Sequence, residues 1–360
     1  MRVVNAMFGR GRGGLEESFL VYHEALQAGG HEVISMFDPR AAVREAIQAL
    51  HVTMEPVRIW THWDPLTVWR VGRVLKAVRP DVIVSHGNRA GRILLRASKD
   101  RWPVLARLPN FRFRRILACH GFIAILPGQV EALEQAGISR ERIFHIPSML
   151  PRLPARKSRP PLNPPVIGAM GRFHPVKGFD VLLQALSWLK QRGIRFRAVL
   201  AGDGEWAGAL RQLTTKLGLD PQVQFPGWIT DRASFYDGIS VLCVPSREEA
   251  FARVMLEAMA HEVPLVVTDA DGPRQVVQHQ QTGLIVPRED FVALGHALQS
   301  LLQNPMWAQK LARQARSQVE TLHTLEATVP LLNRALELTT IRHPRASRAQ
   351  NLCRSQIKTC

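Results

Sequence analysis

Cysteine is scarce in this chain of 360 residues, and its four cysteines include no Cys-x-x-Cys pair. A disulfide framework or a zinc site built from several cysteines is therefore not expected, and a reducing compartment fits. Long apolar runs are lacking too, since no run approaches the ~18 residues that a membrane-spanning helix needs. The N-terminal stretch has no apolar segment of the signal-peptide kind. These absences predict a soluble, cytoplasmic protein.

Aromatic residues are also few, at 7% of the chain, although apolar residues as a whole reach 46% and charged residues 21%. That balance is typical of a globular protein and excludes a disordered or collagen-like chain. At roughly 100–200 residues per domain, the length indicates two domains or one large one.

Positive charge is what the chain has in excess, with a formal net charge of +17. Residues 1–150 carry 21 Lys and Arg against 13 Asp and Glu, residues 151–160 add four basic residues, and residues 341–360 add five. Residues 161–340 are balanced, with 17 of each sign. A basic first half suits nucleic acid, an anionic membrane face or a phosphate-bearing substrate. A merely solvated surface is the alternative.

One stretch of the first half combines basic and aromatic residues. Residues 107–115 place Phe111 and Phe113 between arginines. Such side chains suit the surface of an anionic membrane, where each nearby Lys or Arg contributes ~1 kcal/mol. This stretch is the predicted membrane contact, with an ordinary basic loop as the alternative.

Strands and helices are predicted to alternate along both halves of the chain, which indicates βαβ units and a parallel sheet in each. A proline-rich, basic segment at 156–165 reads as a linker between the halves. In the first half, strands are predicted at 2–4, 31–34, 81–86 and 122–126, and helices at 16–27, 68–78 and 129–136. In the second half, strands are predicted at 166–170, 196–201, 223–225, 241–244 and 265–267, and helices at 180–192, 206–217 and 254–261.

The most informative motif is the run PSREEAFARVMLEAMA, which lies between two apolar strands. Glu249 falls in the loop that leaves the first strand, and Glu257 falls eight residues later within the following helix. A helix N-terminus presents free N–H groups and partial positive charge, which suits a phosphate. The two carboxylates suit hydroxyl groups instead. The motif therefore reads as a nucleotide-sugar clamp, and a helix start with acidic residues near its positive end is the alternative.

A glycine-rich basic loop, GRFHPVKG, directly follows the predicted strand 166–170. Glycine lets the backbone bend and approach a ligand. Arg172 and Lys177 add two cations beyond the carboxyl end of a parallel sheet, which is where open α/β sheets bind ligands. A solvated basic loop is the alternative, but the two motifs together favour a ligand site.

Taken in order, these pieces resemble the retaining glycosyltransferases of family 4, also called group 1, which have the GT-B fold. The matching segments are GRFHPVKGFDVLLQAL, LAGDGEW, VQFPGWITD and VPSREEAFARVMLEAMAHEVPLVVTDADGPRQVVQHQQTGLIVP. They span 171–287, and the first half gives weaker support. The resemblance implies an α/β protein with two Rossmann-like doubly wound domains that face a central cleft.

The resemblance also sets the expected division of the chain. Residues 1–155 are predicted as the acceptor-binding domain and 166–325 as the nucleotide-sugar domain. A helix at 326–340 is expected to pack back toward the N-terminal domain, and 341–360 form a basic tail.

Four positions carry the catalytic and ribose-binding roles that the resemblance implies. Arg172 and Lys177 match the pair that grips the donor diphosphate. Glu249 matches the carboxylate that contacts the transferred sugar, and Glu257 matches the one that binds the donor ribose. Arg172, Lys177 and Glu249 are the predicted catalytic residues.

Further positions complete the two predicted binding sites. The backbone at residues 251–253 would face the distal phosphate. The remaining donor-binding positions are Gly171, Gly202, Trp228, Phe251, Ala252 and Arg253. In the first half, the predicted acceptor and phosphate positions are Gly13, Gly14, His86 and Asn88. His86 has a structural alternative, because a lone histidine after a strand is more often a satisfied core residue.

The sequence departs from the family pattern in three places. Ala250 and Ala252 replace the glycines of the usual E-G-F-G, which narrows the space for the sugar. Ser148 and Met149 replace the frequent asparagine-glycine pair. The stretch 107–110 lacks the histidine that many members carry.

No metal is expected to take part. The spelling Asp269-Ala270-Asp271 occurs, but in a place where the family has a plain loop. The predicted reaction is therefore metal-independent, with side-chain cations and a helix dipole stabilising the leaving nucleoside diphosphate. We expect a UDP-sugar rather than a GDP-sugar as donor and no cofactor. Retention of configuration is expected from the resemblance alone.

The predicted function is sugar transfer to a cell-surface glycan or lipid-linked acceptor of the lipopolysaccharide type, on the inner face of the cytoplasmic membrane. One alternative is a GT-B epimerase or hydrolase of nucleotide sugars, which would need further acids and bases. Another is a nucleic-acid binder, but the chain lacks an RNP, zinc-finger or basic-zipper signature. No nucleic-acid partner is predicted.

Overall fold

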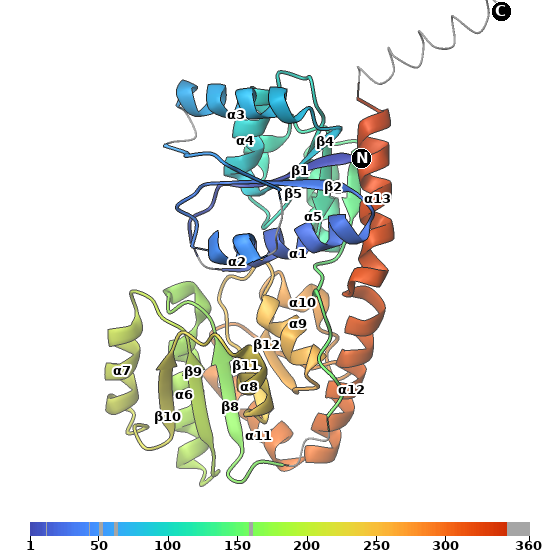
Figure 1. Cartoon of the computed structure of the whole chain (residues 1–360). Coiled ribbons are helices and arrows are strands. Elements are labelled where there is room, and N and C mark those ends of the chain that lie inside the picture. Colours follow the sequence, from blue (N-terminus) through green and yellow to red (C-terminus); the bar gives the residue numbers. More distant parts are fainter. Residues whose placement is uncertain (12, 43, 50–52, 61–63, 158–160, 344–360) are drawn as a thin grey trace, which may run out of the picture. The chain divides into compact units, whose positions relative to one another are not determined.

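The computed structural model describes all residues except 12, 43, 50–52, 61–63, 158–160 and 344–360. The chain divides into two compact units (Figure 1). Unit 1 comprises Met1–Pro151 and Leu322–Cys360, and unit 2 comprises Arg152–Thr321. The predicted linker at 156–165 falls in unit 2, and most of the predicted basic tail lies outside the described residues.

A parallel sheet forms the centre of unit 1. In the described part, seven strands pair in the order β3-β2-β1-β4-β5-β6-β7, and each pairing is parallel. The strands are β1 (Arg2–Met7), β2 (Glu32–Phe37), β3 (Thr53–Pro56), β4 (Val82–His86), β5 (Val104–Arg107), β6 (Gly121–Ala124) and β7 (Ile143–His145).

Helices cover the two faces of this sheet. They are α1 (Gly14–Ala28), α2 (Arg44–Ala49), α3 (Pro65–Val78), α4 (Gly87–Ser98), α5 (Pro127–Gln135) and α13 (Leu325–Ile341). Both faces are therefore apolar: β4 is buried at all five positions, as expected for a parallel strand between helical layers. Short 3-10 turns occur at Arg114–Ile116 and Arg140–Arg142.

The last helix of the chain belongs to unit 1. Figure 1 shows α13, in red, beside α1, and the two helices are in contact. Leu332 and Leu336 of α13 join Tyr22 and Leu26 of α1 in one apolar cluster. The helix therefore contributes core residues to a sheet that is formed almost 200 residues earlier in the chain.

Unit 2 is built on a second parallel sheet. Its six described strands pair in the order β10-β9-β8-β11-β12-β13, again with parallel pairings. The strands are β8 (Val166–Met170), β9 (Arg197–Ala201), β10 (Val223–Gly227), β11 (Val241–Val244), β12 (Leu265–Thr268) and β13 (Leu284–Val286).

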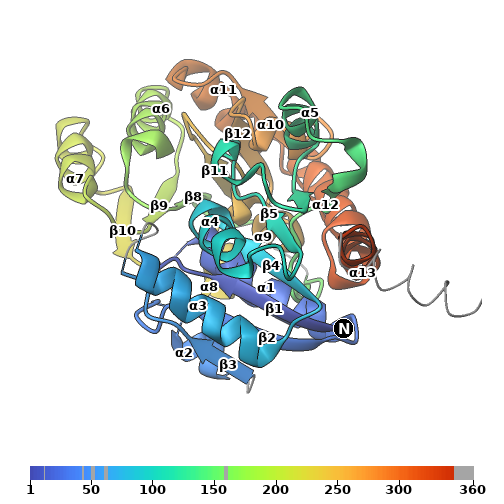
Figure 2. The ribbon, with the colours of Figure 1, turned by 90° about the horizontal axis from the view of Figure 1, so that it is seen from above.

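Seven helices and one short turn accompany this sheet in the described part of unit 2. They are α6 (Phe179–Gln191), α7 (Ala207–Lys216), α8 (Arg232–Asp237), α9 (Arg253–Ala260), α10 (Pro273–Val276), α11 (Phe291–Gln303) and α12 (Pro305–Leu322), with a 3-10 turn at Pro175–Lys177. Figure 2 shows α6 and α7 side by side, and the two helices are in contact.

Both sheets share the doubly wound topology. From the first strand of each unit, the sheet grows in one direction through two strands and then continues on the other side. The order reverses between β1 and β4 in unit 1 and between β8 and β11 in unit 2. Ligands of doubly wound sheets bind beyond the carboxyl ends of the strands at such reversal points. The predicted α/β class is confirmed, and its topology indicates where a ligand site is expected.

All strands and helices predicted from the sequence are present, with ends shifted by a few residues. The predicted strand 122–126 ends at Ala124, because Leu126 caps the next helix. Elements without a prediction include α4, β5, β13 and α11. β5 and β13 have four and three residues, which is too short for a clear periodic pattern.

None of the helices in the described part of the chain combines the length and the apolar composition that crossing a membrane requires.

Candidate active site

Two loops lie beyond the strands at which the sheet of unit 2 reverses. One follows β8 and runs from Gly171 to Gly178, and the other follows β11 and runs from Pro245 to Ala252. Backbone hydrogen bonds join them: the N–H groups of Arg247 and Glu248 both donate to the carbonyl of Val176, at 2.8 and 3.2 Å. The two motifs singled out in the sequence therefore form one site.

An ion pair closes this junction. The Nζ atom of Lys177 lies 2.5 Å from Oε2 of Glu249, and the two side chains are 25% and 10% exposed. The structure thus brings together the cation and the carboxylate that were predicted to hold the donor diphosphate and the sugar. Because the pair is only partly exposed, its attraction is less screened than that of a surface pair.

Two glycines allow the close approach of the loops. Gly178 has φ +64°, and a Cβ there would lie 2.0 Å from the carbonyl oxygen of Pro245. Gly272, after β12, would place a Cβ 2.4 Å from the Ala250 carbonyl oxygen, and its N–H donates to the carbonyl of Glu249 at 2.8 Å. Only residues without a side chain fit these positions, so the backbone on both sides of Glu249 is held in place.

Arg247 anchors the second loop, and the sequence reasoning missed it. Its Nη1 and Nη2 atoms each donate to Asp180 at 2.7 Å, its Nε donates to Glu289 at 2.7 Å, and Nη1 also reaches the Pro175 carbonyl at 2.8 Å. Burial opposes ionisation of Asp180, but the hydrogen bonds and charge of Arg247 outweigh it and lower the pKa of that carboxyl. This bidentate pair fixes the loop two residues before Glu249.

Glu257 lies on α9 and is surrounded by donors. Its Oε1 accepts hydrogen bonds from Arg232 Nη1 at 2.6 Å and from Arg253 Nε at 3.2 Å, and its Oε2 accepts one from the Tyr236 hydroxyl at 2.8 Å. A carboxylate has about four acceptor positions. These bonds occupy three of them and leave one on Oε2 for a ligand hydroxyl. Arg232 and Tyr236 were not predicted, since they come from α8, which has no motif of its own.

The N-terminus of α9 opens onto the same loop. Ala252 is the N-cap residue, and no side chain caps this end of the helix. The N–H groups of the first turn are therefore available to an anion. Ala252 has φ −80°, which any residue adopts, so alanine fits where the family has glycine. Phe251 is half-buried, as is Arg253.

The remaining donor positions lie along the neighbouring strands. Gly202 follows β9 with φ +140°, and a Cβ there would lie 1.9 Å from the carbonyl oxygen of Gly171. Trp228 directly follows β10 and is 42% exposed. Arg172 is exposed, and its side chain makes no ion pair or hydrogen bond with the described residues. It is the uncommitted cation of the loop after β8.

In unit 1, the predicted positions lie at the corresponding reversal point. Gly13 and Gly14 are at the start of α1, after β1, and Gly13 is extended with φ 175°. Asn88 lies in the first turn of α4, after β4, and its amide donates to the carbonyl of Arg112. The topology thus gathers these residues beyond two neighbouring strands, and their acceptor role stays a prediction.

His86 is a core residue. It is 1% exposed, its Nε2 lies 2.8 Å from the Asn5 Oδ1, and its ring packs edge-on against Tyr22 and Phe19. Burial, assisted by the charge of Arg107, lowers its pKa well below the ordinary value. These contacts give the neutral ring a structural part, and an acceptor contact through it stays a prediction.

The predicted membrane contact at 107–115 is wrong for two of its residues. Arg107 and Phe113 are buried, because Arg107 ends a central strand and Phe113 packs in the core of unit 1. Only the arginines at 112, 114 and 115 are exposed in this stretch. A membrane surface cannot reach the two buried side chains.

The two aspartates of the Asp269-Ala270-Asp271 stretch after β12 each pair with an arginine. Oδ1 of Asp269 accepts hydrogen bonds from the N–H and the Nε of Arg288 at 3.0 and 3.1 Å, and Asp271 lies 3.2 Å from Arg274. This arrangement fixes the loop that carries Gly272.

Comparison with known proteins shows which glycosyltransferases the chain is similar to. Residues 154–318 match the profile of the family described as glycosyl transferases group 1. The chain is 28% identical over 318 residues to the lipopolysaccharide core biosynthesis glycosyltransferase LpsD of Rhizobium meliloti, covering 87% of this chain and 91% of that protein. It is likewise 28% identical over 329 residues to LpsE of the same organism, at 87% and 92%.

Solved structures show the same fold. The complex of Anabaena Alr3699/HepE with UDP and glucose matches with a TM-score of 0.81 at 19% identity, over 94% of this chain and 99% of that chain. The lipopolysaccharide outer core galactosyltransferase WaaB matches with a TM-score of 0.75 at 16% identity, over 93% and 98%. The chain is therefore a glycosyltransferase of the GT-B fold, and its segment 154–318 matches the group 1 family model.

Proposed function

We propose that this glycosyltransferase moves a sugar from a nucleotide-sugar donor to a glycan or glycolipid acceptor of the lipopolysaccharide type, with retention of configuration and without a metal ion. The junction of Lys177 and Glu249 at the reversal point of unit 2 carries the proposal. The names of the two Rhizobium relatives support the acceptor class.

Donor binding would rearrange the ion pair. In this structure Lys177 and Glu249 pair with each other. A diphosphate offers Lys177 a doubly charged partner, and Glu249 is then released to accept hydrogen bonds from the sugar hydroxyls. The exposed Arg172 would add a second cation. In this way one residue pair serves both the phosphate and the sugar.

Departure of the nucleoside diphosphate is the step that these groups assist. Negative charge develops on the leaving phosphate in the transition state, where Lys177, Arg172 and the free N–H groups at the start of α9 would stabilise it. Such fixed donors do the work that a bound Mg²⁺ does in other transferases. The activity is therefore expected to persist when divalent cations are removed.

Glu257 is assigned to the ribose. Its carboxylate is fixed by three donors, and the acceptor position left on Oε2 suits one ribose hydroxyl. Trp228, exposed after β10, would line the pocket for the base. We propose a UDP-sugar rather than a GDP-sugar as donor, and the UDP complexes of the similar Anabaena protein support this choice.

Retention is proposed with the acceptor attacking on the face that the leaving group vacates. Glu249 is assigned to binding the sugar hydroxyls rather than to a covalent step. We assign acceptor binding to unit 1, through Gly13 and Gly14. The proposed location is the cytoplasmic side of the membrane, where lipid-linked acceptors present their sugars.

One assay tests the proposal. The purified chain is incubated with a series of UDP- and GDP-sugars and a lipopolysaccharide core acceptor, with and without EDTA, and the anomeric configuration of the product is read by NMR. The proposal expects transfer from a UDP-sugar that EDTA does not reduce, with the configuration of the donor. Release of free sugar without acceptor would indicate a hydrolase instead.

A further inference from the structure

Large apolar side chains are exposed at the start of α3, far in sequence from the donor loops. Trp60, Leu66 and Trp69 are 54%, 46% and 55% exposed. The Asp64 side chain accepts from the N–H groups of Leu66 and Thr67, so this end of the helix is capped and its side chains project from a fixed backbone. Exposed apolar side chains grouped in this way are typical of a surface that contacts another protein or a membrane.

The helix α3 has two distinct faces. Thr67, Val71 and Leu75 are buried on one side. Trp69, Arg73 and Lys76 are exposed on the other. Tryptophan next to basic residues on the outer face of an amphipathic helix is typical of helices that lie at the headgroup level of a membrane.

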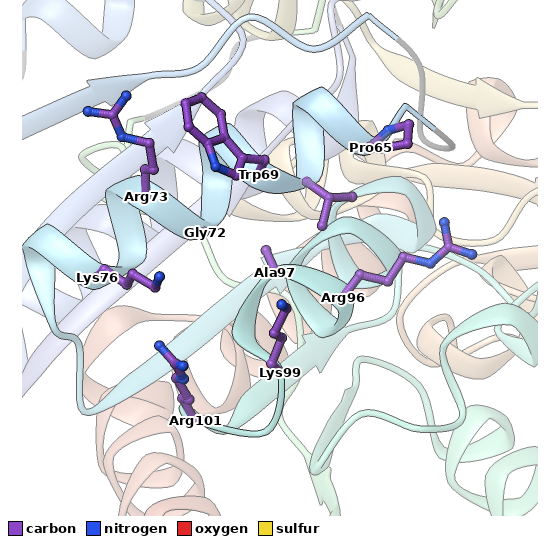
Figure 3. Close-up of a pocket in the computed structure, with 10 residues that line it drawn as sticks. Pro65, Trp69, Gly72, Arg73, Lys76, Arg96, Ala97, Lys99 and Arg101 are labelled. Atoms are coloured by element: carbon purple, nitrogen blue, oxygen red, sulfur yellow. The ribbon is translucent and has the colours of Figure 1, made fainter.

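A hollow of about 410 Å³ lies between α3 and α4, and Figure 3 shows its lining. Five of the lining residues are basic and none of the lining residues is acidic: Arg73, Lys76, Arg96, Lys99 and Arg101. Gly72 and Ala97 form the floor, because a Cβ at Gly72 would lie 3.4 Å from the Ala97 carbonyl oxygen. The two helices thus touch through small residues, and long cationic side chains stand around the contact.

Three cations of this hollow have no counterion among the described residues. Lys76, Lys99 and Arg101 are exposed, and their side chains make no hydrogen bond or ion pair with the described residues. Figure 3 shows the three side chains gathered at the end of the hollow away from Pro65. Like charges held this close repel one another, and an anion such as a phosphate relieves that repulsion.

A second hollow, of about 590 Å³, shares Trp69 and Arg73 with the first. Its charged lining adds Arg58, Arg70 and one carboxylate, Glu55. The Arg73 guanidinium lies 5.0 Å from the centre of the Trp69 ring, and that of Arg58 lies 4.5 Å from the Trp60 ring. Cationic and aromatic groups therefore alternate across the outer side of α3.

We propose that this surface docks on anionic phospholipids. The docking face is defined by Trp60, Leu66, Trp69, Arg73, Lys76, Lys99 and Arg101. The hollow takes a lipid phosphate between Lys76, Lys99 and Arg101, while Leu66 and the two tryptophans enter the boundary between headgroups and acyl chains. A lipid surface is favoured over a soluble phosphate because only the former also covers the apolar side chains.

Flotation of the full chain with vesicles tests the docking face. Vesicles of phosphatidylcholine alone are compared with vesicles that contain about one third phosphatidylglycerol. Each Lys or Arg near an anionic surface contributes about 1 kcal/mol, or about fivefold in binding. The triple variant Lys76→Gln/Lys99→Gln/Arg101→Gln should lose about a hundredfold in binding to anionic vesicles, and Trp69→Ser should weaken binding to both kinds of vesicle.

The matched control removes the same charge from unit 2. Lys310, Arg313 and Arg195 are exposed, with side chains that make no ion pair in the described part of the chain. The variant Lys310→Gln/Arg313→Gln/Arg195→Gln should bind anionic vesicles like the wild type. Equal losses in both triple variants would overturn the proposal, because net charge alone would then explain binding. Thermal unfolding of each variant shows that the fold is intact.

Two further outcomes would also overturn it. One is that the chain binds no vesicles, while glycerol phosphate binds the wild type but not the variant Lys76→Gln/Lys99→Gln/Arg101→Gln. This result would indicate a soluble phosphate ligand. Tighter binding of a short RNA than of anionic vesicles would indicate a nucleic-acid site. Vesicle binding needs no donor or acceptor, so the docking face can hold even if the proposed sugar transfer fails.

Discussion

At the scale of single residues, Glu249 and Glu257 differ in what holds each carboxylate. The carboxylate of Glu249 pairs with the ammonium group of Lys177, which a diphosphate can replace. Glu257 is fixed by donors from two helices. A carboxylate whose partner can be displaced suits contact with the sugar during the reaction. A carboxylate that several donors hold in place suits binding of the ribose, which does not react.

Conservative substitutions of the two carboxylates should separate these roles. Glu249→Gln keeps the shape but removes the charge, and we expect transfer to fall at least a hundredfold, as for other transition-state contacts, with UDP affinity nearly unchanged. Glu257→Gln should weaken UDP binding about tenfold, because one charge-assisted bond is worth roughly 1.5–3 kcal/mol. Calorimetry with UDP and initial rates measure the two effects. Wild-type rates in both variants would contradict the assignment.

The sequence predicted these residues more fully than it predicted their supports. Lys177 and Glu249 each lie in a local motif after an apolar strand, so spacing and the topology of the sheet suffice to bring them together. Arg247 lies beside Glu249 in the same run, yet its partner Asp180 is 67 residues away. Nothing in a local pattern states which distant carboxylate an arginine will meet, so such anchors emerge only from the folded chain.

At the scale of elements, the loop after β8 depends on one glycine. Gly178→Ala should lower the free energy of unfolding by about 2–4 kcal/mol, because the new Cβ meets the Pro245 carbonyl oxygen in addition to the strain of positive φ. It should also weaken UDP binding, since Pro245 begins the loop of Glu249. Urea unfolding and calorimetry measure both effects.

Gly193→Ala is the matched control for this change. Gly193 has φ +72°, similar to Gly178, but a Cβ there meets nothing within 4 Å. Its cost should be limited to about 1 kcal/mol of backbone strain, with UDP binding intact. Equal losses at the two positions would show that the contact with Pro245 does not matter.

The helix α13 should stabilise unit 1 through its inner face. Leu336 is fully buried in the cluster with Tyr22 and Leu26, so Leu336→Ala should cost about 2–5 kcal/mol. Leu331 on the same helix is 43% exposed, and Leu331→Ala should cost less than 1 kcal/mol. Hydrogen exchange followed by mass spectrometry should locate the loss in unit 1. Equal effects of the two substitutions would contradict this packing.

At the scale of the whole molecule, unit 1 should be the part that is sensitive to mild acid. Burial lowers the pKa of His23 and His120 to about 4, and for His120 the charges of His343 and Arg142 add to this effect while that of Asp100 opposes it. Burial also lowers the pKa of His86 well below its ordinary value. In the unfolded chain histidine titrates near pH 6.5. Below that pH the unfolded state binds protons that the folded state does not, so the free energy of unfolding falls as the pH falls.

We expect His23 alone to account for about 1–2 kcal/mol of this loss at pH 5. His23 is fully buried, and its Nδ1 lies 2.9 Å from the Ser35 hydroxyl. His23→Gln can retain that contact but cannot titrate, so its unfolding free energy should depend less on pH than that of the wild type. Urea unfolding at pH 7.5, 6 and 5 measures the difference. An unchanged slope would show that this residue does not contribute.

The topology of the two sheets could be predicted from the sequence, because alternating strands and helices with short connections permit few arrangements. The resemblance led us to expect that the last helix packs toward the first half, but the sequence did not show which of its residues enter the core of unit 1, nor that Phe113 is buried. Both depend on which surfaces remain uncovered after the sheet has formed. The docking face was not predicted either, since its cations come from α3 and from the residues that follow α4.

The most direct measurement is a crystal structure of the chain with a bound UDP-sugar. The account predicts the diphosphate within hydrogen-bonding distance of Lys177 Nζ and of the N–H groups that begin α9, with Glu249 turned from Lys177 to the sugar. A donor bound elsewhere on the chain, or one held at this place with the pair of Lys177 and Glu249 still intact, would contradict it.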